Sequence, residues 1–263
     1  MSALLLTYVI DWVMRKPTED LPRGIRWNIS STIEDLDFAD DLALLSQTHD
    51  HLQEKTDRFS NFANQVGLKI SQTKTEVMTL NITNPTPIQV DEKDLPNTET
   101  FIYLGSTVRN DGGIGNDIMN RLSKARNIFR SLNNVWKSSQ YSKQTKLKLY
   151  QSCILSTLLY RSECWRMTEN DLAKLSVCHT KSLRRIFLPN KISNEDLQRP
   201  CKQESMATIL LRRRWLWIGH VIRKDRNSIT RSALQWTPEG KHKRGRPKNT
   251  WRCAVEGERL ICI

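Results

Sequence analysis

The sequence has little glycine and proline, and it lacks any long hydrophobic run. Ten glycines and nine prolines in 263 residues exclude a collagen-like chain and proline-rich linkers. The only long apolar run covers residues 3–10, which is too short for a bilayer that takes roughly 20 residues to cross. No basic segment precedes this run and no small-residue cleavage site follows it. We therefore expect neither a signal peptide nor a membrane partner.

Cysteine is also missing from the first half of the chain. All six cysteines lie beyond residue 150, and none forms a Cys-x-x-Cys pair. A chain of this length buries enough surface to fold without disulfides, so reduced thiols in an intracellular compartment, nuclear or cytoplasmic, are expected. Cys178, His179, Cys201 and His220 could be zinc ligands, but their spacing matches no common zinc pattern. Buried free thiols are the favoured interpretation.

Charge divides the chain into two regions of opposite sign. Residues 1–115 carry 10 Lys and Arg against 17 Asp and Glu, a net charge of −7. Residues 116–263 carry 31 against 11, a net charge of +20. The second value exceeds what solubility requires of a domain. The basic region is therefore predicted to bind a polyanion such as nucleic acid.

The acidic region shows a mixture of helical and strand patterns, which predicts an α+β fold. Residues 3–16 are predicted as a helix that ends at Pro17, with one stripe formed by Leu4, Tyr8, Asp11 and Trp12. Two short apolar segments surround Ala39-Asp40-Asp41 and predict a β-hairpin with the acids at its tip. The other elements expected are a strand at 24–30, a helix at 49–66 closed by Gly67, and strands at 76–80 and 101–104, separated by a polar, proline-containing stretch at 82–97.

The basic region is predicted to be helical, because apolar residues recur every three or four positions. Helices are expected at 118–136, 143–160, 171–187 and 206–222. The periodicity stops at Thr237, and a basic tail follows. The predicted domains are 1–115, 116–190 and 191–236, followed by a flexible tail at 237–263.

Asp40 and Asp41 are the clearest candidates for chemistry in this sequence. Adjacent carboxylates repel each other unless a cation lies beside them, and Mg²⁺ prefers such oxygen ligands. Phosphoryl transfer by two metal ions needs carboxylates that hold both ions. Two simpler interpretations remain open: the pair lies in an ordinary surface turn, or Asp41 caps a helix that starts at Leu42.

The neighbouring sequence resembles the reverse transcriptases of non-LTR (LINE-type) retrotransposons. Residues 38–41, Phe-Ala-Asp-Asp, resemble the catalytic turn of that family. Residues 67–76 resemble the next block, and residues 101–105, Phe-Ile-Tyr-Leu-Gly, resemble the turn that grips the primer end. The similarity extends to the opening helix at 4–15 and to the C-terminal segments 214–221 and 240–251.

The resemblance implies a partial palm, built from a β-hairpin sheet with helices, followed by an all-α thumb and a C-terminal helical region with a basic tail. It implies roles for the residues that match the family's motifs: Asp40 and Asp41 as catalytic and Mg²⁺-binding residues, Lys74 as a donor of charge or a proton to pyrophosphate, and Tyr103, Leu104 and Gly105 as primer-binding residues. The implied partners are an RNA template and a DNA primer or duplex. Lys74 could instead be an ordinary loop lysine, and Tyr103 a strand aromatic beside a turn glycine.

The sequence also departs from the family pattern. A further metal-binding aspartate, the fingers, the Gln-Gly block and the usual endonuclease should all lie before residue 1. We therefore expect the C-terminal half of a polymerase, with weak or no Mg²⁺ binding and no activity of its own. The alternatives are a non-catalytic nucleic-acid-binding module and a chain with no selected role.

Nucleic-acid contacts are predicted in the basic region. The helix at 206–222 contributes Arg212, Arg213 and Arg214. The tail contributes Lys243, Arg244, Arg246 and Lys248, which resemble an AT-hook that inserts arginine into a narrow minor groove. A nuclear-import signal or a nonspecific basic tail would use the same residues. Four tryptophans are expected in the core or at an interface rather than as base-stacking platforms: Trp136, Trp165, Trp215 and Trp217.

Overall fold

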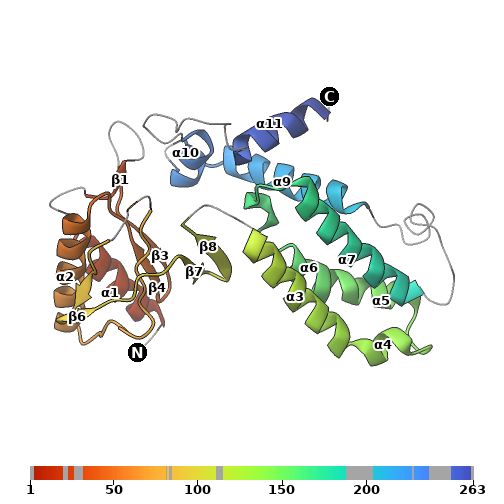
Figure 1. The fold of residues 1–263 in the computed structure, drawn as a ribbon, viewed down its shortest axis with the longest axis horizontal. Helices are drawn as coiled ribbons and strands as arrows, with labels where there is room; N and C mark the ends of the chain where they lie inside the picture. Colours follow the sequence, from red (N-terminus) through yellow and green to blue (C-terminus); the bar gives the residue numbers. More distant parts are fainter. Residues whose placement is uncertain are drawn as a thin grey trace. The chain divides into compact units, whose positions relative to one another are not determined.

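The computed structural model describes residues 3–19, 23–26, 32–80, 82, 85–110, 115–187, 204–226, 228–236 and 250–261. The chain divides into two compact units, residues 1–113 and residues 114–263 (Figure 1). We call them the N-terminal unit and the helical unit. Among the described residues, no helix combines the length and the hydropathy needed to cross a membrane.

Two helices of the N-terminal unit confirm the sequence prediction. They are α1, Ala3–Arg15, and α2, His49–Gln65. The side chain of Thr48 accepts a hydrogen bond from a backbone N–H of the first turn of α2, which satisfies one of the free donors at the helix start. Gly67 follows the end of α2 with a φ of +76°, and its N–H and that of the next residue bond to carbonyls of the last turn. Glycine adopts this left-handed conformation without strain, which explains the sharp stop.

The buried face of α1 differs from the predicted stripe. Leu4 and Tyr8 are 82% and 70% exposed, whereas Val13 and Met14 are buried. The ring of Trp12 meets a phenylalanine of α2 edge-on, with centroids 5.8 Å apart. Burial is therefore confined to the C-terminal half of α1. The periodicity alone indicated a stripe along the whole helix, but it could not show how much of the helix has a neighbour.

All the described strands pair as short antiparallel hairpins, so this unit contains four separate two-stranded sheets. The longest of these strands have four residues each. The pairs are β1 (Ile25–Arg26) with β2 (Thr32–Ile33), β3 (Asp35–Phe38) with β4 (Asp41–Leu44), β5 (Gln89–Val90) with β6 (Lys93–Asp94), and β7 (Thr100–Tyr103) with β8 (Ser106–Arg109). The predicted strand at 24–30 is observed at 25–26, and residues 27–30 lie outside the described part.

Two predictions for this unit are wrong. Residues 76–80 form no strand, and only Val77 makes an isolated bridge, to Asn97. The stretch at 82–97 instead contains β5 and β6, whose neighbourhood supplies a small core of Ile88, Val90 and Leu95. Ile88 and Val90 are two residues apart, so both point to the same side of an extended chain. This apolar alternation spans only a few residues within a polar stretch, so the sequence pattern did not predict a strand here.

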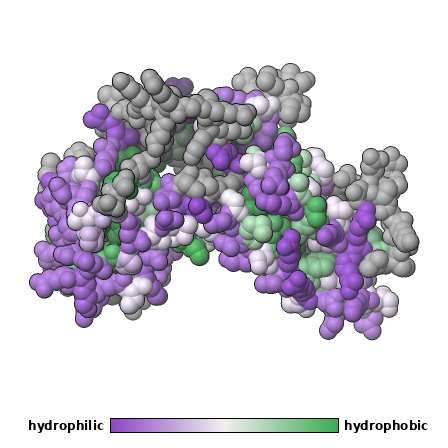
Figure 2. Space-filling view, viewed as in Figure 1, coloured by the Kyte–Doolittle hydropathy of each residue, from purple (hydrophilic) through white to green (hydrophobic). Residues whose placement is uncertain are grey.

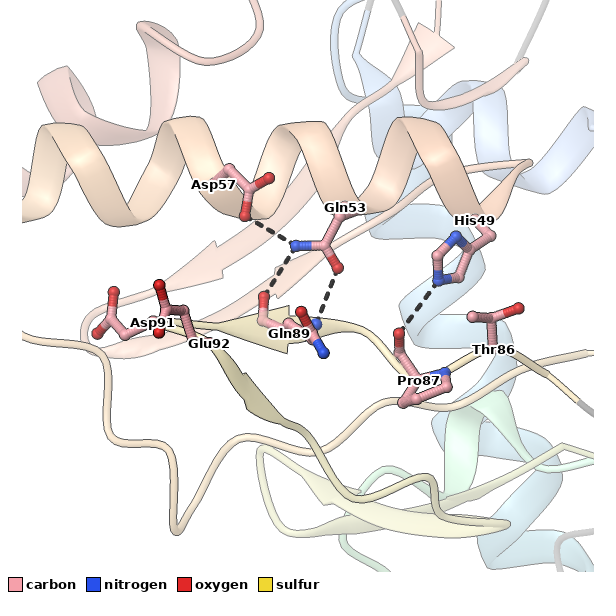
Figure 3. A pocket seen from close by; sticks show the side chains of 8 residues that line it. All are labelled: His49, Gln53, Asp57, Thr86, Pro87, Gln89, Asp91 and Glu92. Atoms are coloured by element: carbon pink, nitrogen blue, oxygen red, sulfur yellow. Dashed lines mark hydrogen bonds between the residues drawn. The ribbon is translucent and has the colours of Figure 1, made fainter.

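One side chain ties β5 to α2 (Figure 3). The Gln53 amide nitrogen donates to the Gln89 carbonyl at 2.9 Å, and its oxygen accepts from the Gln89 N–H at 2.8 Å. The same nitrogen donates to Asp57 at 2.8 Å. His49 Nε2 lies 3.2 Å from the Pro87 carbonyl oxygen. A helix side chain thus takes the place of a neighbouring strand and satisfies the backbone of β5.

The helical unit is built from helices of very different length. Its elements are α3 (Gly115–Ser131), α4 (Asn133–Lys137), α5 (Lys143–Leu149), the π-helical segment η1 (Tyr150–Leu155), α6 (Ser156–Leu158), the 3₁₀ turn η2 (Ser162–Cys164), α7 (Glu169–Phe187), α9 (Met206–Ile222), α10 (Ile229–Gln235) and α11 (Trp251–Ile261). The helices predicted at 171–187 and 206–222 are confirmed.

Three details differ from the prediction. The helix expected at 118–136 breaks at Leu132 into α3 and α4. The helix expected at 143–160 runs through a π-helical segment. Residues 251–261, predicted as part of the tail, form α11. Apolar residues at 251, 254 and 255 were too few to establish a period, and a hydrogen bond from the Trp251 indole to the Glu163 carbonyl stabilises this helix.

One hydrophobic cluster joins α3, the α5–α6 segment, α7 and the start of α9. Ile118, Leu122, Leu158 and Leu175 are at most 1% exposed. Trp136 and Trp165 are buried in the same cluster, which confirms the prediction that they belong to the core. The helical unit therefore buries its apolar helix faces against one another, as the 3.6-residue period predicted.

Candidate functional site

The hairpin of β3 and β4 places two acids at its end. Phe38 lies opposite Asp41, and only Ala39 and Asp40 connect the strands. This confirms the predicted hairpin. Ala39 has a φ of +57°, a conformation that disfavours a Cβ by roughly 1–2 kcal/mol. The rest of the hairpin must hold the turn in this shape.

The side chains of Asp40 and Asp41 at the tip of the hairpin are exposed, and β3 carries two further acidic residues. Residues directly opposite each other share a face, and faces alternate along a strand, so Asp41 lies on the face of Phe38. Asp35 and Asp37 lie on the opposite face. Burial raises the pKa of Asp35, and the negative charge of Asp37 raises it further. Alternation therefore separates these two acids from Asp41.

A buried lysine holds the base of this hairpin. Lys55 of α2 is 3% exposed, and its ammonium donates to the Glu34 carboxylate at 2.7 Å, the Glu34 carbonyl at 3.1 Å and the Leu45 carbonyl at 2.7 Å. Glu34 directly precedes β3 and Leu45 directly follows β4. Burial by itself raises the pKa of Glu34, but hydrogen bonds from Lys55, Thr32 and Gly24 lower it overall. Nothing in the local sequence singles out Lys55, because a lysine in an amphipathic helix is usually solvated.

The predicted primer-binding residues also form a hairpin turn. Leu104 and Gly105 connect β7 to β8 with φ values of 48° and 76°. Two left-handed residues in a two-residue loop match the twist of the flanking strands. The Tyr103 hydroxyl donates to the Leu36 carbonyl of β3 at 3.3 Å. The structure thereby brings the β7–β8 hairpin against the hairpin that carries Asp40 and Asp41.

Lys74 is not brought into contact with these acids. It lies in an exposed turn, where its backbone N–H donates to the Ser71 carbonyl at 3.0 Å. Within the described part of the chain, its ammonium has no hydrogen bond or ion pair. The pocket shown in Figure 3, of about 480 Å³ between α2 and β5, contains none of the predicted catalytic residues. The role of Lys74 stays a prediction.

The two exposed carboxylates fit only part of a magnesium site. Mg²⁺ is commonly bound by one or two protein carboxylates together with water and substrate phosphates, and Asp40 and Asp41 are donors of that kind. Among the described residues, no group of three or more His, Cys, Asp or Glu side chains could hold a metal ion. The described residues therefore supply two carboxylates for such a site, and no larger ligand set.

The three consecutive arginines of α9 have different environments. Arg212 pairs with Glu204 at 2.7 Å, and Arg213 pairs with Glu163 at 2.9 Å. Arg214 is 1% exposed, pairs with Glu258 and donates to the Trp165 carbonyl at 2.9 Å. This burial corrects the prediction that Arg214 contacts nucleic acid, because a phosphate could not reach it. Helical periodicity turns part of a basic run inward, and only the fold shows which arginine is buried.

Arg214 instead contributes to the docking of α11. Its partner Glu258 belongs to α11, and Trp251 of the same helix donates to the Glu163 carbonyl at 2.9 Å. The Arg252 guanidinium donates to the Leu234 carbonyl of α10 at 2.7 Å. The chain after residue 249 therefore returns to α9 and α10. The predicted tail residues between these helices, Lys243, Arg244, Arg246 and Lys248, lie outside the described part.

The cysteine and histidine candidates for zinc have other roles or environments. Cys178 is a buried free thiol. His179 Nδ1 lies 2.8 Å from the Tyr150 hydroxyl, and burial lowers the pKa of His179 to about 4. Cys201 lies outside the described residues. The thiols of Cys164 and Cys253 are exposed, so the interpretation of buried thiols does not hold for these two cysteines. The buried pair of Tyr150 and His179 is therefore a neutral hydrogen-bonded part of the core.

A comparison with known protein families identifies the class to which the N-terminal unit is similar. Residues 1–108 match the family model described as reverse transcriptase (RNA-dependent DNA polymerase). The match contains the β3–β4 hairpin and most of the β7–β8 hairpin, and it ends within β8. Nucleic acids are the substrates that this class implies.

The similarity continues beyond that domain. An uncharacterized transposon-derived protein of Caenorhabditis elegans is 22% identical to this chain over 238 residues, which cover 86% of this chain and 85% of that protein. An alignment of this length must include much of the helical unit. Together, the two comparisons support a reverse transcriptase-like polymerase fragment.

Proposed function

We propose that this chain is the C-terminal half of the reverse transcriptase of a non-LTR, LINE-type retrotransposon. The observation that carries the proposal is the hairpin of β3 and β4, which presents Asp40 and Asp41 together at an exposed tip beside the β7–β8 hairpin. Its place inside the reverse transcriptase match supports the proposal. The N-terminal unit then corresponds to part of the palm, and the helical unit to a thumb and a C-terminal region.

In this proposal, Asp40 and Asp41 hold Mg²⁺ in the intact polymerase. The ion, when bound, supplies positive charge that stabilises the transferring phosphoryl group. Lys55 positions the two acids by holding together the two chain segments at the base of their hairpin. Tyr103 positions the neighbouring hairpin, which receives the primer end. None of these tasks requires the helical unit, whose basic surface instead binds the template and primer.

The isolated chain is proposed to lack polymerase activity. Transfer by two metal ions needs ligands on more than one side of the ion pair, and a single hairpin reaches one side. Positioning of the incoming nucleotide contributes roughly 7–11 kcal/mol to such reactions, and each 1.4 kcal/mol lost slows them about tenfold. The test is primer extension on an RNA template by the full chain, with Asp40→Asn/Asp41→Asn as the matched control. No extension is expected from either, and extension that only the control loses would overturn the proposal of inactivity.

Nucleic-acid binding is tested separately, with a fluorescent DNA primer annealed to RNA. We expect the full chain to bind it, with log Kd rising by roughly 0.7–0.9 per phosphate contact for each tenfold rise in salt concentration. The Asp40→Asn/Asp41→Asn chain should bind at least as tightly, because two negative charges near the substrate are removed. Absence of binding, or binding that ignores salt, would contradict the proposal.

A second candidate function is a binding module without catalysis. It is favoured by the helical unit, in which residues 118–162 contain nine Lys and Arg but no Asp or Glu. Both candidates predict salt-dependent binding. Only the polymerase predicts that an upstream palm segment, supplied as a separate polypeptide, restores extension that depends on Asp40 and Asp41.

A further inference from the structure

A small pocket lies where the end of α3, the start of α4 and the end of α7 meet. It has a volume of about 350 Å³, and it is lined by Phe129, Arg130, Asn133 and Arg185. This volume is at the lower end of the range for small-molecule sites. The presence of two guanidinium groups and one aromatic ring around a single pocket needs a physical explanation.

The two guanidinium groups have no acidic partner in the described structure. Arg185 donates to the neutral side chain of Asn133 at 3.4 Å, and Arg130 makes no ion pair among the described residues. The acids of α3 and α7 are all in the first turns of these helices, far along the chain from the pocket residues. Basic residues in a last turn also favour the helix dipole. The helix dipole explains a positive charge at each of these positions, but it does not explain why both charges line one pocket together with an aromatic ring.

The aromatic ring of the pocket is fixed by the core beneath it. Phe129 stacks on Trp136, with ring centroids 5.0 Å apart and planes 17° from parallel. Trp136 is buried, and its indole N–H donates to the Phe129 carbonyl at 2.7 Å. One face of the Phe129 ring is therefore held against Trp136, while the residue remains half-buried at the pocket. A preordered ring loses little entropy when a ligand stacks on it.

We propose that this pocket binds one nucleotide unit of a single-stranded nucleic acid. Arg130 and Arg185 bind the phosphate, because the planar guanidinium group can donate two parallel hydrogen bonds to it. The base lies against Phe129, as in other single-strand sites that combine a basic groove with aromatic rings. A base inside a duplex is already stacked on both sides and cannot enter. This inference rests on the proposed nucleic-acid binding by the helical unit, and it adds a location and a preference for single strands.

The experiment measures fluorescence anisotropy of a labelled twelve-residue oligothymidine and of a duplex of the same length with the full chain. Phe129→Leu keeps an apolar side chain but removes the aromatic face. Because stacking contributes roughly 1–3 kcal/mol per base, single-strand binding should weaken about 5–100-fold while duplex binding stays nearly unchanged. Phe129→Tyr should retain wild-type binding, and a thermal melt verifies that each variant is folded.

The charges are tested with a matched pair of double variants. Arg130→Gln/Arg185→Gln and Lys124→Gln/Lys148→Gln each remove two positive charges, and Lys124 and Lys148 are exposed residues that do not line the pocket. We expect the first variant to weaken single-strand binding at least tenfold more than the second. Equal losses from both variants would overturn the pocket while leaving general nucleic-acid binding intact. A wild-type chain that binds neither probe would overturn the proposed function as well.

Discussion

The two units of this chain bury apolar surface in different ways. In the helical unit, long amphipathic faces meet in one continuous cluster from Ile118 to Leu210. In the N-terminal unit, the strands form separate pairs, and a small core of Ile88, Val90 and Leu95 lies between α2 and the β5–β6 hairpin. A helix satisfies its own backbone and needs only a neighbour for one face, whereas a two-stranded sheet leaves both outer edges and a face without partners.

Both units also leave large apolar side chains exposed. The hairpins of the N-terminal unit expose large apolar side chains, including Phe38 at 63% and Ile102 at 70%. Hydrophobic patches also interrupt the hydrophilic visible surface of both units (Figure 2). The buried apolar cluster of the N-terminal unit is small, so the stability of this unit should depend more on particular polar contacts such as that of Lys55. Substitutions that remove polar contacts and substitutions that remove apolar ones should thus affect the two units differently.

Loss of Lys55 should destabilise the N-terminal unit most strongly. Lys55→Met removes the donor to Glu34 and Leu45 and leaves the Glu34 carboxylate partly buried without its cation. Breaking a buried pair in this way destabilises proteins by about 3–5 kcal/mol. Urea unfolding gives the free energy, and hydrogen exchange in α2 and β3–β4 locates the change. Arg15→Ala, at an exposed pair with Asp11, is the control and should change stability by less than about 1 kcal/mol. Similar effects from both substitutions would show that Lys55 has no special role.

Truncation of a core leucine should distinguish the helical unit from α1. Leu175 is 0% exposed and Leu4 is 82% exposed. Leu175→Ala should lower the free energy of unfolding by about 2–5 kcal/mol, because it removes buried contacts and leaves a cavity. Leu4→Ala should change it by less than about 0.5 kcal/mol. Urea denaturation of both variants measures the difference, and a large effect at Leu4 would mean that the first half of α1 has a neighbour.

Acid should weaken the helical unit through His179. Burial lowers its folded pKa to about 4, below the ordinary 6.5. Between these values the unfolded chain binds more protons than the folded chain, so stability falls as the pH drops. The expected loss between pH 7 and pH 5 is about 2 kcal/mol. Urea unfolding at both pH values measures it. His179→Gln cannot titrate there and should show a loss smaller by that amount, whereas an unchanged loss would contradict the assignment.

The smallest expected effect concerns the contact between the two hairpins. Tyr103→Phe removes the hydroxyl that donates to the Leu36 carbonyl but keeps the ring. The loss should be about 0.5–1.5 kcal/mol, as for one neutral hydrogen bond. Hydrogen exchange should report faster opening of β3–β4 and β7–β8 with little change in α7. Faster exchange in α7 alone would contradict the proposed local role.

Much of the secondary structure followed from the sequence. The alternation around Asp40 and Asp41 determined a hairpin with these acids at its tip, and the glycine after α2 determined where that helix ends. The apolar period predicted α7 and α9, because a helix face recurs every 3.6 residues whatever lies beside it. The opposite charges of the two regions follow from residue counts alone. The boundary between the two compact units, at residues 113 and 114, lies beside the change of charge near residue 115.

The partners of each face could not be predicted in the same way. Local periodicity states which residues share a face, but burial depends on what another part of the chain places against it. The sequence could not show that Lys55 closes the base of the acidic hairpin, or that Tyr103 meets Leu36 from 67 residues away. The same limit explains why Arg214 is buried between α11 and Trp165, although its neighbours Arg212 and Arg213 are not. Residue type and spacing determined the candidates, and long-range packing decided which side chains support the structure and which remain available to a ligand.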